Sequence, residues 1–309
     1  MRSTRFWHHV MLAVALGSGA IVTTSARQFT EWSPPLNLGP IIDSAYNDQH
    51  PAISPDGLSL YFVSDRPGGT GGLDLWVTQR DSPEDPWQTP IPLGSAVNSL
   101  ATEFAPAFSP SAHWLFFGSD RPGGCGGQDL WVSFRQNKRD DFDWQTPVNL
   151  GCVINFSGAD DGPTYVEDDS GGVTLYFTSL NRPGGLGDYD IWASALNADG
   201  TFSPPVNVVE LNSAVRDTRT AIRRGGGEII FQSSRSGGVG GFDLWTSTRD
   251  EQSLVWSVPV NLGAVVNSTA NDGAPALSRD GQSLFFYSNR PGGSGANDLY
   301  VSTRTRAKP

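Results

Sequence analysis

Short apolar runs recur along the chain, and turn-forming residues separate them. In the first unit these runs are PAIS (51–54), LYFVS (60–64), DLWVT (74–78) and the outer segment WQTPIPLG (87–94). A PDG turn (55–57) separates the first two runs, and a glycine-rich segment separates the second from the third. Runs of this length between such turns predict four short β-strands per unit. Because 60–64 is apolar on both faces, we expect neighbouring sheets to cover it on both sides.

The unit occurs five times. The segment DRPGGTGGLDLW (65–76) returns with the same internal spacing at 120–131, 181–192, 234–245 and 289–300. An aromatic residue opens each outer segment, at Trp32, Trp87, Trp144, Phe202 and Trp256. The five repeats span about residues 32–80, 87–135, 144–196, 202–249 and 256–304. Repeats of this length, each made of four strands, are typical of β-propeller blades.

These repeats predict an all-β fold, a five-bladed β-propeller of four-stranded antiparallel blades. The chain starts with a fourth-strand segment (34–39) and ends on a third strand (298–304). We therefore expect the N-terminal strand to pair within the last blade and close the ring, which leaves no open sheet edge. The aromatic residue near the end of each repeated segment is expected in the core between blades: Trp76, Trp131, Trp192, Trp245 and Tyr300.

The first 26 residues have the features of a signal peptide. Arg2 and Arg5 precede an apolar run from Val10 to Val22, and small residues follow at 24–26. We expect cleavage after Ala26, which leaves residues 27–309 as one propeller domain in the periplasm or secreted, without membrane insertion. In such an oxidising compartment Cys125 and Cys152 are candidates for a disulfide. Both are expected on the same face of the second blade.

The charge of the chain argues against a nucleic-acid partner. There are 21 lysines and arginines against 32 aspartates and glutamates, a net charge of −11. Cleavage removes Arg2 and Arg5, so the mature domain keeps 19 basic residues against 32 acidic ones. An acidic surface repels phosphate backbones and anionic lipid headgroups. We expect a monomer, and no spacing of Cys and His resembles a metal site.

Charged residues also follow the repeat. Each arginine of the glycine-rich segments lies eight residues before an aspartate, in the pairs Arg66 and Asp74, Arg121 and Asp129, Arg182 and Asp190, Arg235 and Asp243, and Arg290 and Asp298. A further acid precedes each innermost strand, at Asp48, Glu103, Asp160, Asp217 and Asp272, and Asp161 is an alternative in the third unit. Strand directions place all of these on one face. Their presence in every unit favours a structural role, with each arginine bonded to an acid or to loop carbonyls.

The third and fourth units break this symmetry. An insertion around 167–172 lengthens the third unit, and Arg216, Arg219, Arg223 and Arg224 surround Asp217 in the fourth. A specific ligand would therefore bind near these two units, on an acid-rich face that includes Arg216 and Arg219.

The segments PAISPDGLSLYFVSDRPGG (51–69) and PALSRDGQSLFFYSNRPGG (275–293) resemble the WD-repeat-like propeller repeats of the TolB type. That resemblance covers nearly all of the mature chain. It implies an exported interaction platform, so the main expectation is a non-catalytic module that binds a protein or glycan.

The alternative is a five-bladed-propeller glycoside hydrolase that uses Asp48, Glu103 and Asp160 at the starts of inner strands. A weaker hypothesis is calcium bound by acids and loop carbonyls. No cofactor is evident, since the chain has no nucleophile elbow, phosphate-binding loop or zinc-protease motif.

Overall fold

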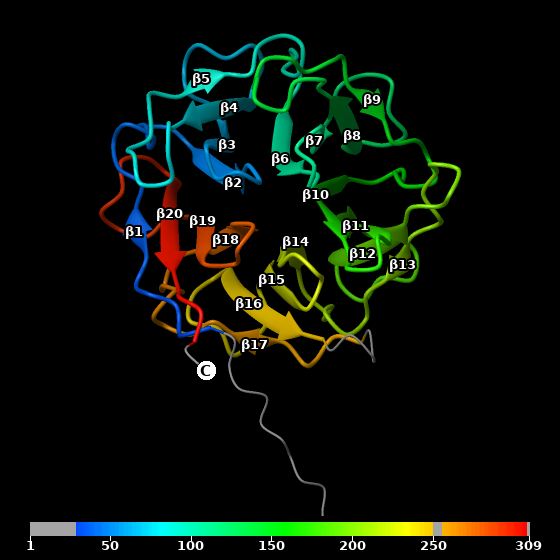
Figure 1. The fold of residues 1–309 in the computed structure, drawn as a ribbon. Helices are drawn as coiled ribbons and strands as arrows, with labels where there is room; N and C mark the ends of the chain where they lie inside the picture. The colour runs from blue at the N-terminus through cyan, green and yellow to red at the C-terminus, as the bar shows by residue number, and fades with distance from the viewer. Residues whose placement is uncertain (1–28, 250–254, 308–309) are drawn as a thin grey trace, which may run out of the picture.

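Five four-stranded antiparallel sheets surround a central axis (Figure 1), as the repeats predict. The computed structural model describes residues 29–249 and 255–307, so the predicted signal peptide lies outside the described residues. Blade one contains β2 (Asp48–Ile53), β3 (Ser59–Ser64), β4 (Asp74–Gln79) and β5 (Ile91–Pro92). Blade two contains β6 (Glu103–Phe108), β7 (Trp114–Ser119), β8 (Asp129–Phe134) and β9 (Val148–Asn149).

The third blade contains the longest strands of the ring. It consists of β10 (Asp160–Glu167), β11 (Val173–Leu180), β12 (Tyr189–Ala195) and β13 (Val206–Asn207). Blade four consists of β14 (Asp217–Ile222), β15 (Glu228–Ser233), β16 (Asp243–Thr248) and β17 (Val260–Asn261). The first two strands of blade three have eight residues where those of the other blades have six, because the insertion around 167–172 extends their hairpin.

The last blade joins the two ends of the chain. It contains β18 (Asp272–Leu277), β19 (Ser283–Ser288) and β20 (Asp298–Thr303), and its outer strand is β1 (Leu36–Asn37). In the register of this pair Leu36 lies opposite Val301. The Ser302 hydroxyl donates to the Ser33 carbonyl at 2.6 Å, and a further bridge links Phe29 to Arg306. The predicted closure of the ring by the N-terminal strand is confirmed.

The inner strands carry proline because their free edge faces the channel. Pro51, Pro106, Pro163 and Pro275 occupy matching positions on β2, β6, β10 and β18. A proline has no N–H to donate, so it is tolerated on an edge strand. Blade four has Thr220 at this position, and its hydroxyl donates to the hydroxyl of Thr164 at 2.9 Å. The exception thus forms a side-chain bond between two neighbouring inner strands.

Apolar side chains from neighbouring blades form the core. Phe62, Phe117, Phe177, Phe231 and Phe286 on the second strands are fully buried. The aromatic residues that end the repeated segments are only 5–7% exposed, at Trp76, Trp131, Trp192, Trp245 and Tyr300. Burial on this scale contributes roughly 1.5–3 kcal/mol for each large side chain. The stacking of the blades therefore explains why these strands are apolar on both faces.

One polar contact pins the loop that enters each inner strand. In blade one the Asn98 side chain accepts from the Leu75 N–H at 2.9 Å and donates to the Leu75 carbonyl at 3.0 Å. The same two-way contact is made by Asn155, Asn212 and Asn267.

In the closing blade Asp43 holds this position. It accepts from the Leu299 N–H at 2.8 Å, but its second carboxylate oxygen has no hydrogen-bond partner among the described residues. Burial raises the pKa of Asp43 to about 7. Only the protonated carboxyl can replace the amide as a donor.

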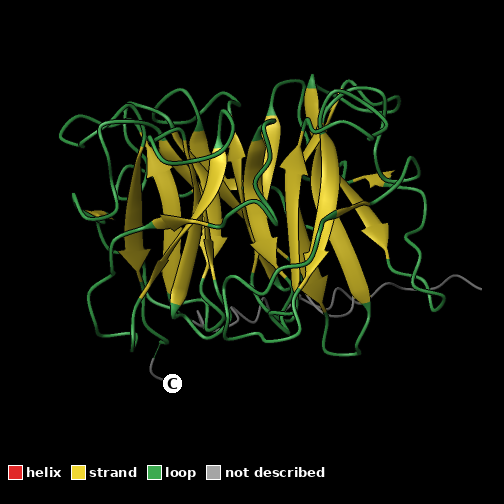
Figure 2. Ribbon diagram, turned by 90° about the horizontal axis from the view of Figure 1, so that it is seen from above, coloured by secondary structure: helices red, strands yellow, loops and turns green. Residues whose placement is uncertain are grey.

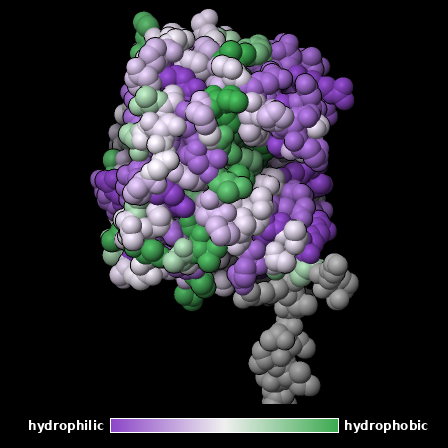
Figure 3. Space-filling model, turned by 90° about the vertical axis from the view of Figure 1, so that its left-hand side faces the viewer, coloured by the Kyte–Doolittle hydropathy of each residue, from purple (hydrophilic) through white to green (hydrophobic). Residues whose placement is uncertain are grey.

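Loops lie on the two flat sides of the disc (Figure 2). We call one side the arginine-loop face; it holds the glycine-rich segments and the loops that enter the inner strands. The other, the hairpin face, holds the turns at 54–58, 109–113, 168–172, 223–227 and 278–282 that join first and second strands. Figure 3 shows the outer wall, where small hydrophobic groups are scattered among hydrophilic ones. In the described part of the chain, no helix has the length and apolar character to cross a membrane.

Candidate functional site

The five acids that precede the inner strands form five ion pairs on the arginine-loop face. Arg121 contacts Glu103 at 2.9 Å and Arg182 contacts Asp160 at 3.1 Å. The remaining pairs are Arg66 with Asp48, Arg235 with Asp217 and Arg290 with Asp272. All five acid side chains are 0% exposed.

Both partners of each pair are held by further bonds. Glu103 accepts from the Ser99 N–H at 2.9 Å and from the Ser99 hydroxyl at 2.5 Å. Arg121 also donates to the Val97 carbonyl at 2.6 Å, and its guanidinium lies 5.1 Å from the centre of the Phe117 ring. These contacts bind the loop entering each inner strand to the loop that follows the second strand. The candidate catalytic acids Asp48, Glu103 and Asp160 are thus enclosed within the scaffold.

The second acid of each repeat holds its own glycine-rich loop. Asp74 accepts from the N–H groups of Thr70 and Gly71 at 2.7 and 3.1 Å. A Cβ on Gly69 would lie 2.0 Å from an Asp74 carboxylate oxygen, and one on Gly71 would lie 2.1 Å from the Ala101 carbonyl. Glycine is therefore required for close approach at both positions. Equivalent loop contacts are made by Asp129, Asp190, Asp243 and Asp298.

The arginines of the fourth unit do not gather around Asp217. Arg216 pairs with Asp188 at 2.7 Å on the surface of the arginine-loop face. Arg219 pairs with Asp161 at 2.8 Å, between the inner strands of blades three and four. Burial raises the pKa of Asp161. Burial also lowers the pKa of His50 well below its ordinary value, and the positive charge of Arg219 lowers it further. These groups form a buried polar cluster inside the channel.

Each inner strand has one residue with a left-handed backbone conformation. This residue determines where the side chains of the cluster lie. The backbone φ is 51° at His50 and 52° at Arg219, and the register of each first strand pair shifts at this point. Such a bulge inserts an extra residue and turns its side chain. In the third unit the residue is Gly162, and a Cβ there would lie 3.1 Å from the Arg219 side chain. The pairing of Arg219 with Asp161 across blades was not predictable from spacing.

A pocket of about 680 Å³ opens in the channel on the hairpin face. All five inner strands line it, and the aromatic side chains of Phe108 and Tyr165 contribute to its wall. Its charged lining differs from blade to blade. The inserted hairpin of blade three supplies Glu167, Asp168 and Asp169, whereas blades four and five supply Arg224 and Arg279.

Sequence reasoning placed the ligand face on the opposite side of the disc. The signal for this pocket lay in the turns: PDG (55–57) in the first unit corresponds to EDDSGG (167–172) in the third and RRGGG (223–227) in the fourth. The sequence of this turn differs between units, unlike the glycine-rich segments, which repeat in all five. That a specific ligand binds near units three and four stays a prediction.

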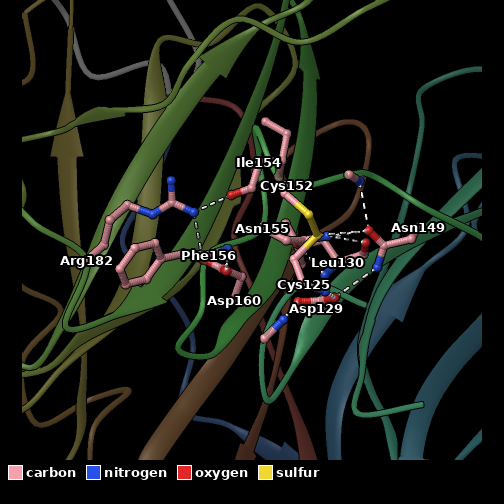
Figure 4. Close-up of a disulfide and its surroundings, with 12 residues drawn as sticks. Cys125, Asp129, Leu130, Asn149, Cys152, Ile154, Asn155, Phe156, Asp160 and Arg182 are labelled. Atoms are coloured by element: carbon pink, nitrogen blue, oxygen red, sulfur yellow. Dashed lines mark hydrogen bonds and ion pairs between the residues drawn. A yellow bond between two sulfur atoms is a disulfide. The ribbon is translucent and has the colours of Figure 1, made fainter. Parts of the chain in front are cut away.

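The two cysteines form a disulfide on the arginine-loop face of blade two, with Cα atoms 5.5 Å apart (Figure 4). Cys125 lies in the glycine-rich loop beside Asp129, and Cys152 follows the outer strand. The bond thus joins the two kinds of loop that the Arg182–Asp160 ion pair joins at the next blade. Within the described ranges, no group of three or more His, Cys, Asp or Glu side chains is placed to hold a metal ion. Calcium binding stays a prediction.

No protein-family model matches the chain, and a search of curated proteins gave no match. Solved structures do match its fold. An α-L-arabinofuranosidase from Lactobacillus brevis is 15% identical over 86% of this chain and 92% of its own, with a TM-score of 0.56. An endo-arabinase from Bacteroides thetaiotaomicron is 15% identical over 90% of this chain and 99% of its own, with a TM-score of 0.57.

A third match is a GH62 hydrolase in complex with xylotriose. It is 12% identical over 90% of this chain and 98% of its own, with a TM-score of 0.58. Two of the classes among these similar structures are the family-43 and GH62 glycoside hydrolases. At such identities the likeness shows the fold: this chain is similar to the five-bladed propellers of glycoside hydrolases.

The predicted relationship to TolB-type WD-repeat-like proteins is wrong, and with it the expectation of a non-catalytic interaction module. The similar solved structures belong to glycoside hydrolases, the class named as the alternative. The proline and the PDG turn, on which the TolB-type resemblance rested, both follow from the local geometry of a blade. Proline suits an inner edge strand, and PDG suits the tight turn that follows it.

Proposed function

We propose that the protein is a glycoside hydrolase that binds a glycan in the channel pocket of the hairpin face. The observation that carries this proposal is the pocket itself. It lies on the axis of the propeller, has a volume of about 680 Å³, and combines aromatic walls with carboxylates. Pockets of this size, mainly apolar with a few polar groups, are typical of small-ligand sites.

The inserted hairpin of blade three provides the carboxyl groups. Glycoside hydrolysis needs two of them, one that protonates the leaving oxygen and one that remains charged. Asp168 suits the charged role, because one of its oxygens accepts from the Ser170 hydroxyl at 2.6 Å and from the Ser170 and Gly172 N–H groups at 2.8 Å. Bonds from Ser170 and Gly172 lower the pKa of Asp168.

Glu167 is our candidate for the proton donor. It is the last residue of β10, and it lines the pocket two residues after Tyr165, on the same side of the strand. Burial raises the pKa of Tyr165, so its phenol keeps its proton beside Glu167. The Tyr165 ring stacks on Phe116 with centroids 5.2 Å apart, which fixes one wall of the pocket. A sugar ring held against this wall would lie beside Glu167.

The similar solved structures support a glycan as the class of substrate. Two of the similar structures were solved with xylotriose, a neutral sugar chain. The expected export of the mature domain, to the periplasm or beyond, would bring it to polysaccharides outside the cytoplasm. The disulfide is consistent with an oxidising compartment.

The test is hydrolysis by the mature protein, residues 27–309. Arabinan, arabinoxylan, glucuronoxylan, polygalacturonate and chromogenic glycosides form the substrate panel, and reducing ends measure turnover. Glu167→Gln keeps the shape of the side chain but cannot donate the proton, so we expect turnover to fall by about 100-fold or more. Glu210→Gln makes the same change at an exposed position outside the pocket and should leave turnover unchanged.

The ring acids are tested in the same assay. Glu103→Gln should lower the melting temperature, since Glu103 is buried in an ion pair. A variant that kept its melting temperature and lost turnover would move catalysis to the arginine-loop face. Failure of the wild-type protein to cleave any glycan of the panel would contradict the proposed activity.

A further inference from the structure

Acids and arginines from different blades line the hairpin-face pocket. The acids come from blade three, and two arginines come from the turns of blades four and five, Arg224 and Arg279. A second groove of about 620 Å³ runs outward from this point and shares both arginines and Asp169 with the channel pocket. The basic side of the site is therefore continuous from the channel axis toward the rim.

Two other arginines at or near this groove are engaged by the protein. Arg80 donates to the carbonyls of Gly57 and Pro83 at 2.8 and 2.6 Å. Arg304 holds Glu228 through two hydrogen bonds, of 2.8 and 2.6 Å. Their charges are therefore used to fix strand ends and turns.

Arg224 and Arg279 differ from these residues. Both side chains are exposed, and neither guanidinium makes an ion pair or hydrogen bond with another described residue. In a protein of net charge −11, two unpaired guanidinium groups on one pocket are unexpected on composition alone. A guanidinium binds a carboxylate through two parallel N–H bonds, which makes arginine well suited to this anion.

Two of the three acids that line the groove are bonded within their own turns. Asp280 accepts from the Ser278 hydroxyl at 2.6 Å, from the Gln282 N–H at 3.0 Å and from the Gln282 side-chain amide at 2.6 Å. Asp56 accepts from the Ser54 hydroxyl at 2.6 Å and from the Leu58 N–H at 3.2 Å. Both of these carboxylates belong to their own turns. The third acid, Asp169, would lie 3.4 Å from a Cβ on Gly225, but it forms no ion pair with Arg224 or Arg279 in the described part of the chain.

We infer that the glycan is acidic, and that Arg224 and Arg279 bind the carboxylate of a hexuronate unit. This inference rests on the proposed function, since it names the substrate class of the same pocket. The acids of blade three would repel that carboxylate from their own part of the pocket. Attraction to blades four and five and repulsion from blade three would orient the chain in the pocket.

The test compares the binding of three trisaccharides by calorimetry: trigalacturonate, its methyl ester and xylotriose. At about 50 mM NaCl we expect trigalacturonate to bind about tenfold or more tightly than the two neutral sugars, with a loss of that preference near 300 mM. The double variant Arg224→Gln/Arg279→Gln should lose the preference and keep the affinity for neutral sugar. Arg139→Gln removes an exposed arginine outside both pockets and should change neither.

Equal affinity for charged and neutral sugars would overturn the inference, as would an equal effect of Arg139→Gln, which would indicate bulk attraction. Displacement of trigalacturonate by an equal concentration of inorganic sulfate would show a site for free anions and would also overturn it. The inference about binding and the proposal of hydrolysis can be rejected independently of each other. Arginine-dependent binding of the acidic sugar without cleavage would retain the inference and reject the hydrolase, whereas cleavage without acidic preference would do the reverse.

Discussion

The two faces of the disc use charged side chains in opposite ways. On the arginine-loop face, five arginines are each paired with a fully buried acid, and the pattern is the same in every blade. On the hairpin face, the charged residues differ between blades, and Arg224 and Arg279 border an open pocket. Charge that repeats with the fold stabilises the fold. In this protein the candidate site lies where the repeat is broken.

The largest expected difference between the faces concerns single arginines. Arg121→Ala leaves Glu103 buried without its partner, so the free energy of unfolding should fall by about 3–5 kcal/mol. Arg224→Ala makes the same chemical change on the hairpin face and should alter it by no more than about 0.5 kcal/mol. Urea unfolding of both variants measures this difference. Similar losses in the two variants would contradict the division between the faces.

We expect Asp43 to make the protein less stable as the pH rises. This residue lies at the closing blade, on the arginine-loop face. Its pKa is about 7 in the folded protein against 3.8 when unperturbed, so the folded state binds the proton more strongly. Its stabilising contribution is present below pH 4 and is lost as the pH rises to about 7. The span of some three pKa units corresponds to about 4 kcal/mol.

Asp43→Asn supplies the amide that the other four blades use, and it does not titrate. The variant should be more stable than the wild type at pH 8, and this advantage should shrink toward pH 4. Urea unfolding across that range, with the difference taken between the two proteins, isolates Asp43 from other titrating groups. A difference that does not change with pH would show that folding leaves the pKa of Asp43 unchanged.

The disulfide should make a smaller contribution to the same face. It closes a loop of 27 residues between Cys125 and Cys152. Replacing both cysteines with serine should lower the free energy of unfolding by about 3 kcal/mol through the greater freedom of the unfolded chain. Glycan hydrolysis at a temperature where the variant is folded should not change, because the bond is on the opposite face from the pocket. Loss of hydrolysis in the folded variant would link the two faces.

Much of the fold was predictable because it follows from local chemistry repeated five times. The spacing of 18 residues between Glu103 and Arg121 marks an ion pair, and the strand segments at the two ends of the chain indicate the closure. The pairing of Arg219 with Asp161 was not predictable. It joins two blades and depends on a bulge, which sequence periodicity does not reveal.

The candidate site was harder to predict than the fold. In a repetitive sequence the residues that every unit shares, such as Asp48 and Arg66, are the most apparent. These residues belong to the scaffold. Glu167 ends β10 and Arg224 lies in the turn after β14, and turns readily accommodate changes of sequence and length. Their common pocket forms only when five inner strands surround the axis, so no single repeat contains it.

The most direct test of the division between the faces is hydrogen exchange of the mature protein with and without a bound glycan. We expect slower exchange on binding in the turns 168–172, 223–227 and 278–282, with no change in the glycine-rich loops at 65–73 and 120–128. Protection confined to those glycine-rich loops would place the ligand on the arginine-loop face and would contradict this division between the faces.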